Sequence, residues 1–192
     1  MKILSRSTLS PTDLAGLTPA SIFLELGAGS ERMLNRHGAL LCLAAARAFS
    51  AELRVSCDIH RVGLYCVTPG DFPDPEVENL LDESTDALHR RFRKTVPPLN
   101  YLKHRLGGAV GWVSVATGIR GPTRAFTHER FGVRHAAEQA RLDLADGSVT
   151  HGLVVAARAG ERETAGALLF VRGGGDALEE TRDLARHVGM EP

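Results

Sequence analysis

The stretch Gly118-Ile119-Arg120-Gly121-Pro122, followed by Thr127-His128-Glu129-Arg130-Phe131-Gly132, carries most of the structural information in this chain. The Gly-x-x-Gly-Pro motif predicts the end of a helix, because glycine and proline both interrupt helical backbone. A short strand over residues 123–127 is expected to follow and to turn sharply into another helix. This layout is typical of a nucleophile elbow, in which a reactive side chain stands at a helix N-terminus. Glu129 occupies the position where the nucleophile is expected.

Helices and strands alternate on both sides of this stretch. Apolar periodicity predicts helices over residues 31–49, 75–93, 99–117, 129–145 and 177–187. Continuous apolar runs predict strands over residues 61–68, 123–127, 151–157 and 165–171. Such runs favour an α/β fold with a mainly parallel sheet covered by helices. Because only a turn at residues 158–164 separates the last two strands, we expect those two to pair antiparallel.

The 192 residues predict a single domain, residues 1–192, with an ordinary soluble composition of 43% hydrophobic and 24% charged residues. Residues 1–30 are poorly patterned and are expected to form a less ordered lead-in. Within them, residues 21–26 fit either a short strand or a turn of helix.

Charge and apolar patterning exclude several classes of function. The 23 basic and 23 acidic residues cancel, so we expect neither nucleic-acid nor acidic-membrane binding. The longest apolar runs, residues 39–49 and 109–116, are too short to span a bilayer, and no signal peptide is visible. The three cysteines, Cys42, Cys57 and Cys66, lack metal-ligand spacing and are interpreted as reduced thiols of a cytoplasmic protein.

The ordered succession of these motifs resembles the N-terminal half of a β-ketoacyl synthase, a member of the thiolase-like superfamily. The resemblance covers about residues 31–172 and includes the Gly118–Pro122 motif, Thr127, Gly132 and the apolar strand ending at Val154-Val155-Ala156-Ala157. The segment Arg61-Val62-Gly63-Leu64-Tyr65 resembles an earlier core strand of that half. The resemblance implies half of a thiolase-like fold.

This sequence departs from the family at its reactive residue. The family presents cysteine in a Thr-Ala-Cys-x-x-Gly turn, and aligning Thr127 and Gly132 places Glu129 at the cysteine position. Condensation needs a thiolate, which the helix N-terminus favours, whereas an acyl group on a carboxylate would be lost by hydrolysis. The family's second half, with its two histidines and a lysine, is also expected to be missing. The resemblance therefore implies a degenerate, non-catalytic protein.

Within the family, this pattern is most similar to the chain-length factors of type II polyketide systems. They lack the cysteine, pair with an active synthase and shape the tunnel in which the acyl chain grows. The resemblance implies a dimer, either with a full-length ketosynthase or with itself, in polyketide or fatty-acid-like biosynthesis. Its interface is expected to include Thr123, Arg124, Ala125, Phe126, Val133 and Ala137. A basic run is a further candidate for docking an acidic acyl carrier protein, through Arg90, Arg91, Arg93 and Lys94.

Two other functions remain open at this stage. Glu129, with His128 beside it, is a candidate base for decarboxylation or hydrolysis of an acyl thioester, although a helical first-turn glutamate has the same appearance. A small homodimeric binding module is the other alternative. The eight histidines are dispersed, and the Gly173-Gly174-Gly175 run lacks the spacing of a phosphate loop. We therefore expect neither a metal site nor a cofactor.

Overall fold

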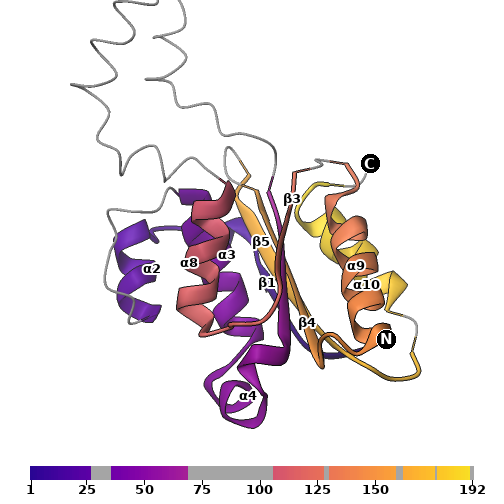
Figure 1. The fold of residues 1–192 in the computed structure, drawn as a ribbon. Helices are drawn as coiled ribbons and strands as arrows, with labels where there is room; N and C mark the ends of the chain where they lie inside the picture. The colour runs from indigo at the N-terminus through magenta and orange to yellow at the C-terminus, as the bar shows by residue number, and fades with distance from the viewer. Residues whose placement is uncertain (27–35, 69–105, 128–129, 159–161, 176, 191–192) are drawn as a thin grey trace, which may run out of the picture.

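A five-stranded mixed sheet forms the centre of the protein. The computed structural model describes residues 1–26, 36–68, 106–127, 130–158, 162–175 and 177–190, and within them the strand order is β1-β5-β4-β2-β3 (Figure 1). The strands are β1 (Lys2–Leu9), β2 (Val62–Val67), β3 (Thr123–Phe126), β4 (His151–Arg158) and β5 (Thr164–Val171).

The sheet is parallel on one side and antiparallel on the other. β2 runs parallel to β3 and β4, whereas β5 is antiparallel to both β4 and β1. The expected antiparallel pairing of β5 with β4 is confirmed. A mainly parallel sheet was expected, but half of the pairings are antiparallel, because the short turn after β4 leaves no room for a crossover helix.

Helices cover both faces of this sheet and produce an α/β sandwich. One face carries α1 (Pro11–Leu14), α2 (Pro19–Leu26), α3 (Arg36–Ala48), α4 (Ala51–Ser56) and α8 (Leu106–Thr117), and the other carries α9 (Gly132–Asp146) and α10 (Leu178–His187). Each face buries its own apolar cluster, one built around α3 and α8 and one around α9 and α10. The helix-covered α/β fold predicted from the sequence is confirmed.

Helix α3 lies at the centre of the first layer. Every residue from Ala39 to Ala45 has no exposed surface, and the helix contacts β1, β4, β5 and α8. Its alanines allow this close approach, since a small side chain lets neighbouring backbones come near. The helix expected at residues 31–49 is therefore a core element, and only its residues from Arg36 onward are described.

The first 26 residues correct the sequence-based expectation. Instead of a less ordered lead-in they form β1, which pairs with β5, and then α1 and α2. A capping box opens α1, because the Ser10 hydroxyl accepts from the amide of Asp13 while the Asp13 carboxylate accepts from the amide of Ser10. The strand was missed because its alternating polar side chains lie on a partly exposed edge.

Other boundaries agree with the sequence to within a few residues. Residues 21–26 are helical as the last six of the eight residues of α2, and the αL glycine Gly147 ends α9 close to the predicted end at residue 145. The helix expected at residues 75–93 lies outside the described residues. In the part of the chain that the structure describes, no helix has the length and apolar character needed to cross a membrane.

Candidate functional site

The turn from β3 into α9 lies at the edge of the sheet where β2 and β3 both end. These strands are parallel and in register, from Leu64 opposite Thr123 to Val67 opposite Phe126. The amide of Thr68 donates to the carbonyl of Phe126 at 2.9 Å and closes the ladder. The chain then reaches Gly132, the first residue of α9, directly beyond this edge. The strand and the helix start predicted within residues 123–132 are present on either side of residues 128–129.

Gly132 allows α9 to start against the end of β2. A Cβ at this position would lie 2.5 Å from Cγ1 of Val67, well inside van der Waals contact, so a larger residue would push the helix away. Phe131 is the N-cap residue and provides no side-chain cap. The amide groups in the first turn of α9 therefore place their partial positive charge at the elbow.

Thr127 is exposed immediately after β3, while His128 and Glu129 lie outside the described residues. The helix expected to begin at Glu129 instead begins at Gly132. Exposed Arg130 lies over the Phe131 ring, 5.5 Å from its centroid, so a cation accompanies the helix N-terminus. An anion at this turn is favoured by both features, and the role of Glu129 stays a prediction.

The Gly118–Pro122 segment connects α8 to β3 by running against the start of β2. Gly118 adopts a left-handed φ of 75° and ends α8. The amide of Arg120 donates to the Ile59 carbonyl at 3.0 Å, and that of Leu64 donates to the Pro122 carbonyl at 2.8 Å. Ile119 is buried. The helix stop predicted from this motif is confirmed, and its backbone contacts set the register of β3 on β2.

Among the strands that the structure describes, β3 lies at the edge of the sheet, with β2 on one side. The carbonyls of Pro122 and Phe126 point to β2, as their bonds with Leu64 and Thr68 show. In a parallel ladder alternate residues bond to the same neighbour, so the amide and carbonyl groups of Thr123 and Ala125 point away from the sheet. Thr123, Arg124 and Ala125 are exposed. Within the described residues, these backbone groups face no other strand.

Two of the residues expected in an interface lie instead inside the chain. Val133 is 1% and Ala137 is 5% exposed, and both pack on the sheet within the cluster of α9 and α10. Their apolar spacing marks the inward face of the helix. The outward face of α9 carries Arg134, Glu138 and Arg141, with Glu138 and Arg141 paired at 2.6 Å.

A buried carboxylate connects β2, β3 and α9. Asp143 on α9 accepts a hydrogen bond from the Tyr65 hydroxyl at 2.7 Å and one from the Gln139 amide at 2.7 Å. Arg124 of β3 lies 3.3 Å from the same carboxylate, whose side chain is 7% exposed. Burial and then the Asp143 hydrogen bond raise the pKa of Tyr65. This network holds the strand and the helix of the elbow together, and no motif in the sequence predicted it.

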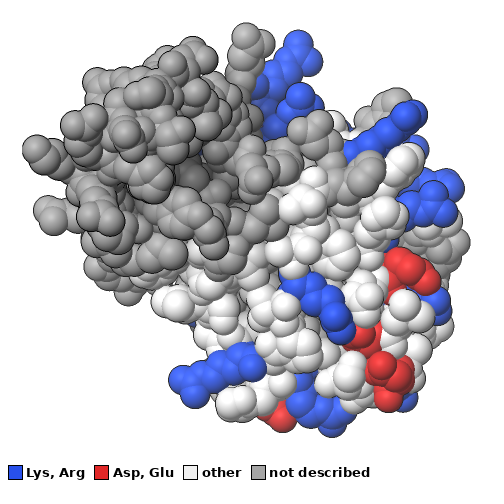
Figure 2. Space-filling model, turned by 45° about the horizontal axis from the view of Figure 1, so that its top comes forward, with Lys and Arg blue, Asp and Glu red and all other residues white. Residues whose placement is uncertain are grey.

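Arg90, Arg91, Arg93 and Lys94 lie outside the described residues. Among the residues that the structure places, no group of three or more His, Cys, Asp or Glu side chains is arranged to hold a metal ion. On the face shown in Figure 2, Lys and Arg side chains are spread over the described surface, and the fewer Asp and Glu side chains gather toward its lower right.

Comparison with known proteins identifies the fold. No family model and no curated protein sequence matches this chain. Solved structures do, beginning with a type II polyketide acyl-carrier protein in complex with its ketosynthase, AntDE:AntF, at a TM-score of 0.63, 15% identity and 93% coverage of this chain. The chain has a ketosynthase-like fold.

Two further structures show the same likeness. The ishigamide ketosynthase/chain length factor matches 97% of this chain with a TM-score of 0.61 and 17% identity. A β-ketoacyl synthase from Burkholderia phymatum matches 94% with a TM-score of 0.61 and 14% identity. The chain spans 63%, 73% and 54% of these three matched chains, about half or somewhat more of a ketosynthase. The resemblance inferred from the sequence is confirmed at the level of fold.

Proposed function

We propose that this ketosynthase-like chain is a non-catalytic subunit of the chain-length-factor type. It pairs with a ketosynthase in polyketide or fatty-acid-like biosynthesis and shapes the acyl tunnel there. The observation that carries this proposal is the open edge of β3 beside an elbow without a thiol. All three cysteines precede residue 67, so the segment from β3 to α9 contains none.

The geometry of β3 supports pairing with a second chain. An edge strand with free amide and carbonyl groups is a template for another strand, and natural proteins cover or blunt such edges. Thr123 and Ala125 are themselves neither proline nor charged, although Pro122 precedes them and Arg124 lies between them. One matched structure is itself described as a ketosynthase/chain length factor, and another as a ketosynthase in complex with its chain length factor.

The test is co-expression and co-purification with a full-length type II ketosynthase, followed by sedimentation at micromolar concentration. Ala125→Pro is the decisive variant, because it removes an amide that points outward and spares the bonds between β3 and β2. We expect this variant to weaken association at least tenfold, since each 1.4 kcal/mol of lost interaction is a factor of ten.

Ala125→Val is the matched control, since it also enlarges the side chain but keeps the amide. We expect it to associate as the wild type does. Separate sedimentation of wild-type chain and ketosynthase would overturn the heterodimer, and dimers of the chain alone that Ala125→Pro dissociates would favour the homodimeric module instead.

The lost chemistry is tested on the purified chain without a ketosynthase. Because the subunit has no nucleophile, we expect the wild-type chain to convert acyl and malonyl thioesters no faster than a Glu129→Ala control does. Turnover that depends on Glu129 would replace the non-catalytic proposal with an acyl-thioester decarboxylase or hydrolase.

Carrier docking is a separate part of the proposal. The proposed docking residues are Arg90, Arg91, Arg93 and Lys94, and their charge would complement an acidic carrier protein. The double change Arg90→Glu and Arg91→Glu is expected to weaken carrier binding and its salt dependence. Arg141→Glu, on the outward face of α9, is the control for a general charge effect.

A further inference from the structure

A cysteine and a histidine are in contact at the end of the sheet opposite the elbow. Cys57 is the C-cap residue of α4 and His151 is the first residue of β4. The parallel pairing of β2 with β4 sets Val62 opposite His151, so the segment that leads into β2 lies beside the start of β4. The Sγ of Cys57 lies 3.4 Å from Nε2 of His151. Both side chains are partly exposed.

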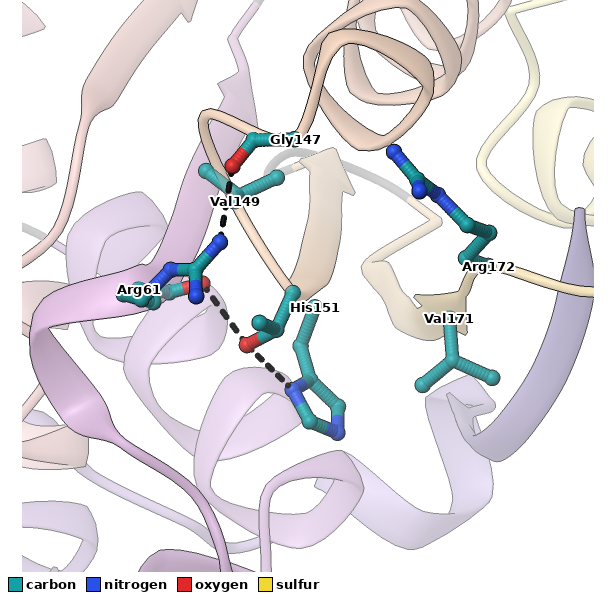
Figure 3. Close-up of a pocket in the computed structure, with 7 residues that line it drawn as sticks. Arg61, Gly147, Val149, His151, Val171 and Arg172 are labelled. Atoms are coloured by element: carbon teal, nitrogen blue, oxygen red, sulfur yellow. Dashed lines mark hydrogen bonds between the residues drawn. The ribbon is translucent and has the colours of Figure 1, made fainter.

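A hydrogen-bonded chain orients the imidazole toward the thiol. Thr150 Oγ1 donates to the carbonyl oxygen of Arg61 at 3.2 Å, and it lies 3.0 Å from Nδ1 of His151 (Figure 3). Because the hydroxyl proton is directed to Arg61, the hydroxyl accepts from Nδ1–H, which leaves the lone pair of Nε2 facing Cys57. Burial lowers the pKa of His151, which keeps the imidazole neutral and able to accept a proton at neutral pH.

A cavity of about 320 Å³ adjoins His151, and it does not directly border Cys57. His151 forms part of its wall, together with Val149, Val171 and the guanidinium groups of Arg61 and Arg172. Both arginines are held by the C-terminal end of α9: Arg61 donates to the Gly147 carbonyl at 2.8 Å, and Arg172 donates to the Leu144 carbonyl at 2.6 Å. Within the described residues neither arginine forms an ion pair with a carboxylate, although the charge of Arg172 helps to lower the pKa of Asp146.

We infer that Cys57 and His151 form a reactive thiol–imidazole pair, and that the adjoining cavity receives a small disulfide carrying carboxylate groups. Nucleophile, base and orienting hydroxyl occur here in the order that activates a thiol. The aliphatic walls suit a short chain, and the two guanidinium groups suit its carboxylates. This site lies at the end of β2 and β4 opposite the elbow and uses none of the elbow's residues.

The reaction is thiol–disulfide exchange. His151 Nε2 takes the thiol proton as the Cys57 sulfur attacks one sulfur of the disulfide, and the S–S bond of the reagent breaks. Cys57 is thereby oxidised to a mixed disulfide. The other half of the reagent leaves as a thiolate, is the reduced product and receives the proton from the imidazolium. A reduced thiol reverses the step, so Cys57 is a reversible modification site.

The experiment is modification of the full chain by oxidised glutathione, an anionic disulfide, and by cystamine, a cationic one. Intact mass and peptide mapping assign the modified cysteine. We expect one adduct, on Cys57, forming at least about tenfold faster in the native chain than in the same chain unfolded in urea at the same pH. The buried Cys42 and Cys66 act as internal controls. Equal rates for Cys57 in the native and unfolded chain would overturn the reactive pair without recourse to any variant.

Single substitutions test the role of the base and the role of the cavity separately. His151→Gln is expected to slow both reagents about tenfold or more, and Thr150→Val to slow both by a smaller factor, with urea midpoints confirming that each variant folds. Arg172→Gln is expected to slow oxidised glutathione but not cystamine, since only the anionic reagent gains from the guanidinium. An unchanged ratio of the two rates in Arg172→Gln would overturn the anionic ligand, and an unchanged rate in His151→Gln would overturn the base.

Discussion

The hydroxyl oxygen of Tyr65 lies 2.7 Å from a carboxylate oxygen of Asp143, inside the layer between the sheet and α9. Because Tyr65 belongs to β2 and Asp143 to α9, this bond joins the strand at the centre of the parallel half to the helix that follows the elbow. Arg124 extends the contact to the edge strand β3. A buried carboxylate is stable only with such partners, so the position of the elbow depends on this network.

Removing the Tyr65 hydroxyl is expected to destabilise the protein by about 1–3 kcal/mol, because a buried charged group loses one hydrogen bond. Urea unfolding of Tyr65→Phe measures this loss. Arg124→Ala is the comparison: Arg124 is 48% exposed, so the cost of losing its ion pair is expected to stay below about 1 kcal/mol. A larger effect for Arg124→Ala than for Tyr65→Phe would show that the exposed cation, and not the phenol, holds Asp143.

Gly121 is expected to tolerate no side chain. A Cβ there would overlap the carbonyl oxygen of Val62 and lie 2.9 Å from that of His60, and both are backbone atoms that cannot rotate away. Gly121→Ala is therefore expected to cost about 1–3 kcal/mol in the free energy of unfolding.

Gly111 provides the matched glycine. A Cβ at this position of α8 meets no atom within 4 Å, so Gly111→Ala is expected to be neutral or to stabilise by up to about 1 kcal/mol. Thermal or urea unfolding of both variants checks the pair. Equal destabilisation by the two alanines would contradict the close approach of residues 118–122 to β2.

His37 is expected to make stability fall in mild acid. Burial lowers its pKa from 6.5 to about 4, so the folded state keeps this imidazole neutral where the unfolded chain protonates it. Between pH 6.5 and 4 the unfolded state therefore binds more protons, and the free energy of unfolding decreases as the pH falls. At pH 5 the loss relative to pH 7 is expected to be about 2 kcal/mol from this residue.

Urea unfolding across this pH range measures the effect. His37→Gln, which does not titrate, should remove most of the slope. Burial also lowers the pKa of His151, so this residue contributes to the pH dependence in the same direction. His151→Gln is therefore expected to remove a smaller part of the slope. A slope that His37→Gln leaves unchanged would place the acid sensitivity elsewhere.

Cys42 is expected to be inert to thiol reagents until α3 opens. Its side chain has no exposed surface, and burial raises its pKa to about 12, so neither access nor ionisation favours reaction. Labelling of Cys42 should follow the unfolding equilibrium and accelerate with urea in proportion to the opened fraction. Rapid labelling of Cys42 in the native chain, at a rate near that of Cys57, would show that α3 is less stably packed than its burial implies.

Much of the architecture could be predicted because local sequence patterns determine where many of the helices and strands form. Runs of apolar residues such as Leu153 to Ala157 indicate a strand buried on both faces, and those residues are indeed buried. Gly118 and Gly147 end helices because each adopts a left-handed backbone that other residues avoid. The likeness to ketosynthases followed from the order of these signals, although sequence identity to the matched structures compared above is at most 17%.

Features that depend on partners distant in the sequence could not be predicted. β1 was missed because its strand character comes from pairing with β5, more than 150 residues later, and not from its own polar sequence. Val133 and Ala137 were expected in an interface, yet an apolar stripe on a helix indicates burial without saying against which surface.

The linear pattern of residues 118–132 was enough to define a helix stop, a short strand and a turn without a cysteine, because each follows from the backbone preferences and identity of a few adjacent residues. Folding alone brought Tyr65 to Asp143, 78 residues apart, and Cys57 to His151, 94 residues apart. Such contacts depend on the register of paired strands and the packing of helices across them, and neither is encoded within any short segment.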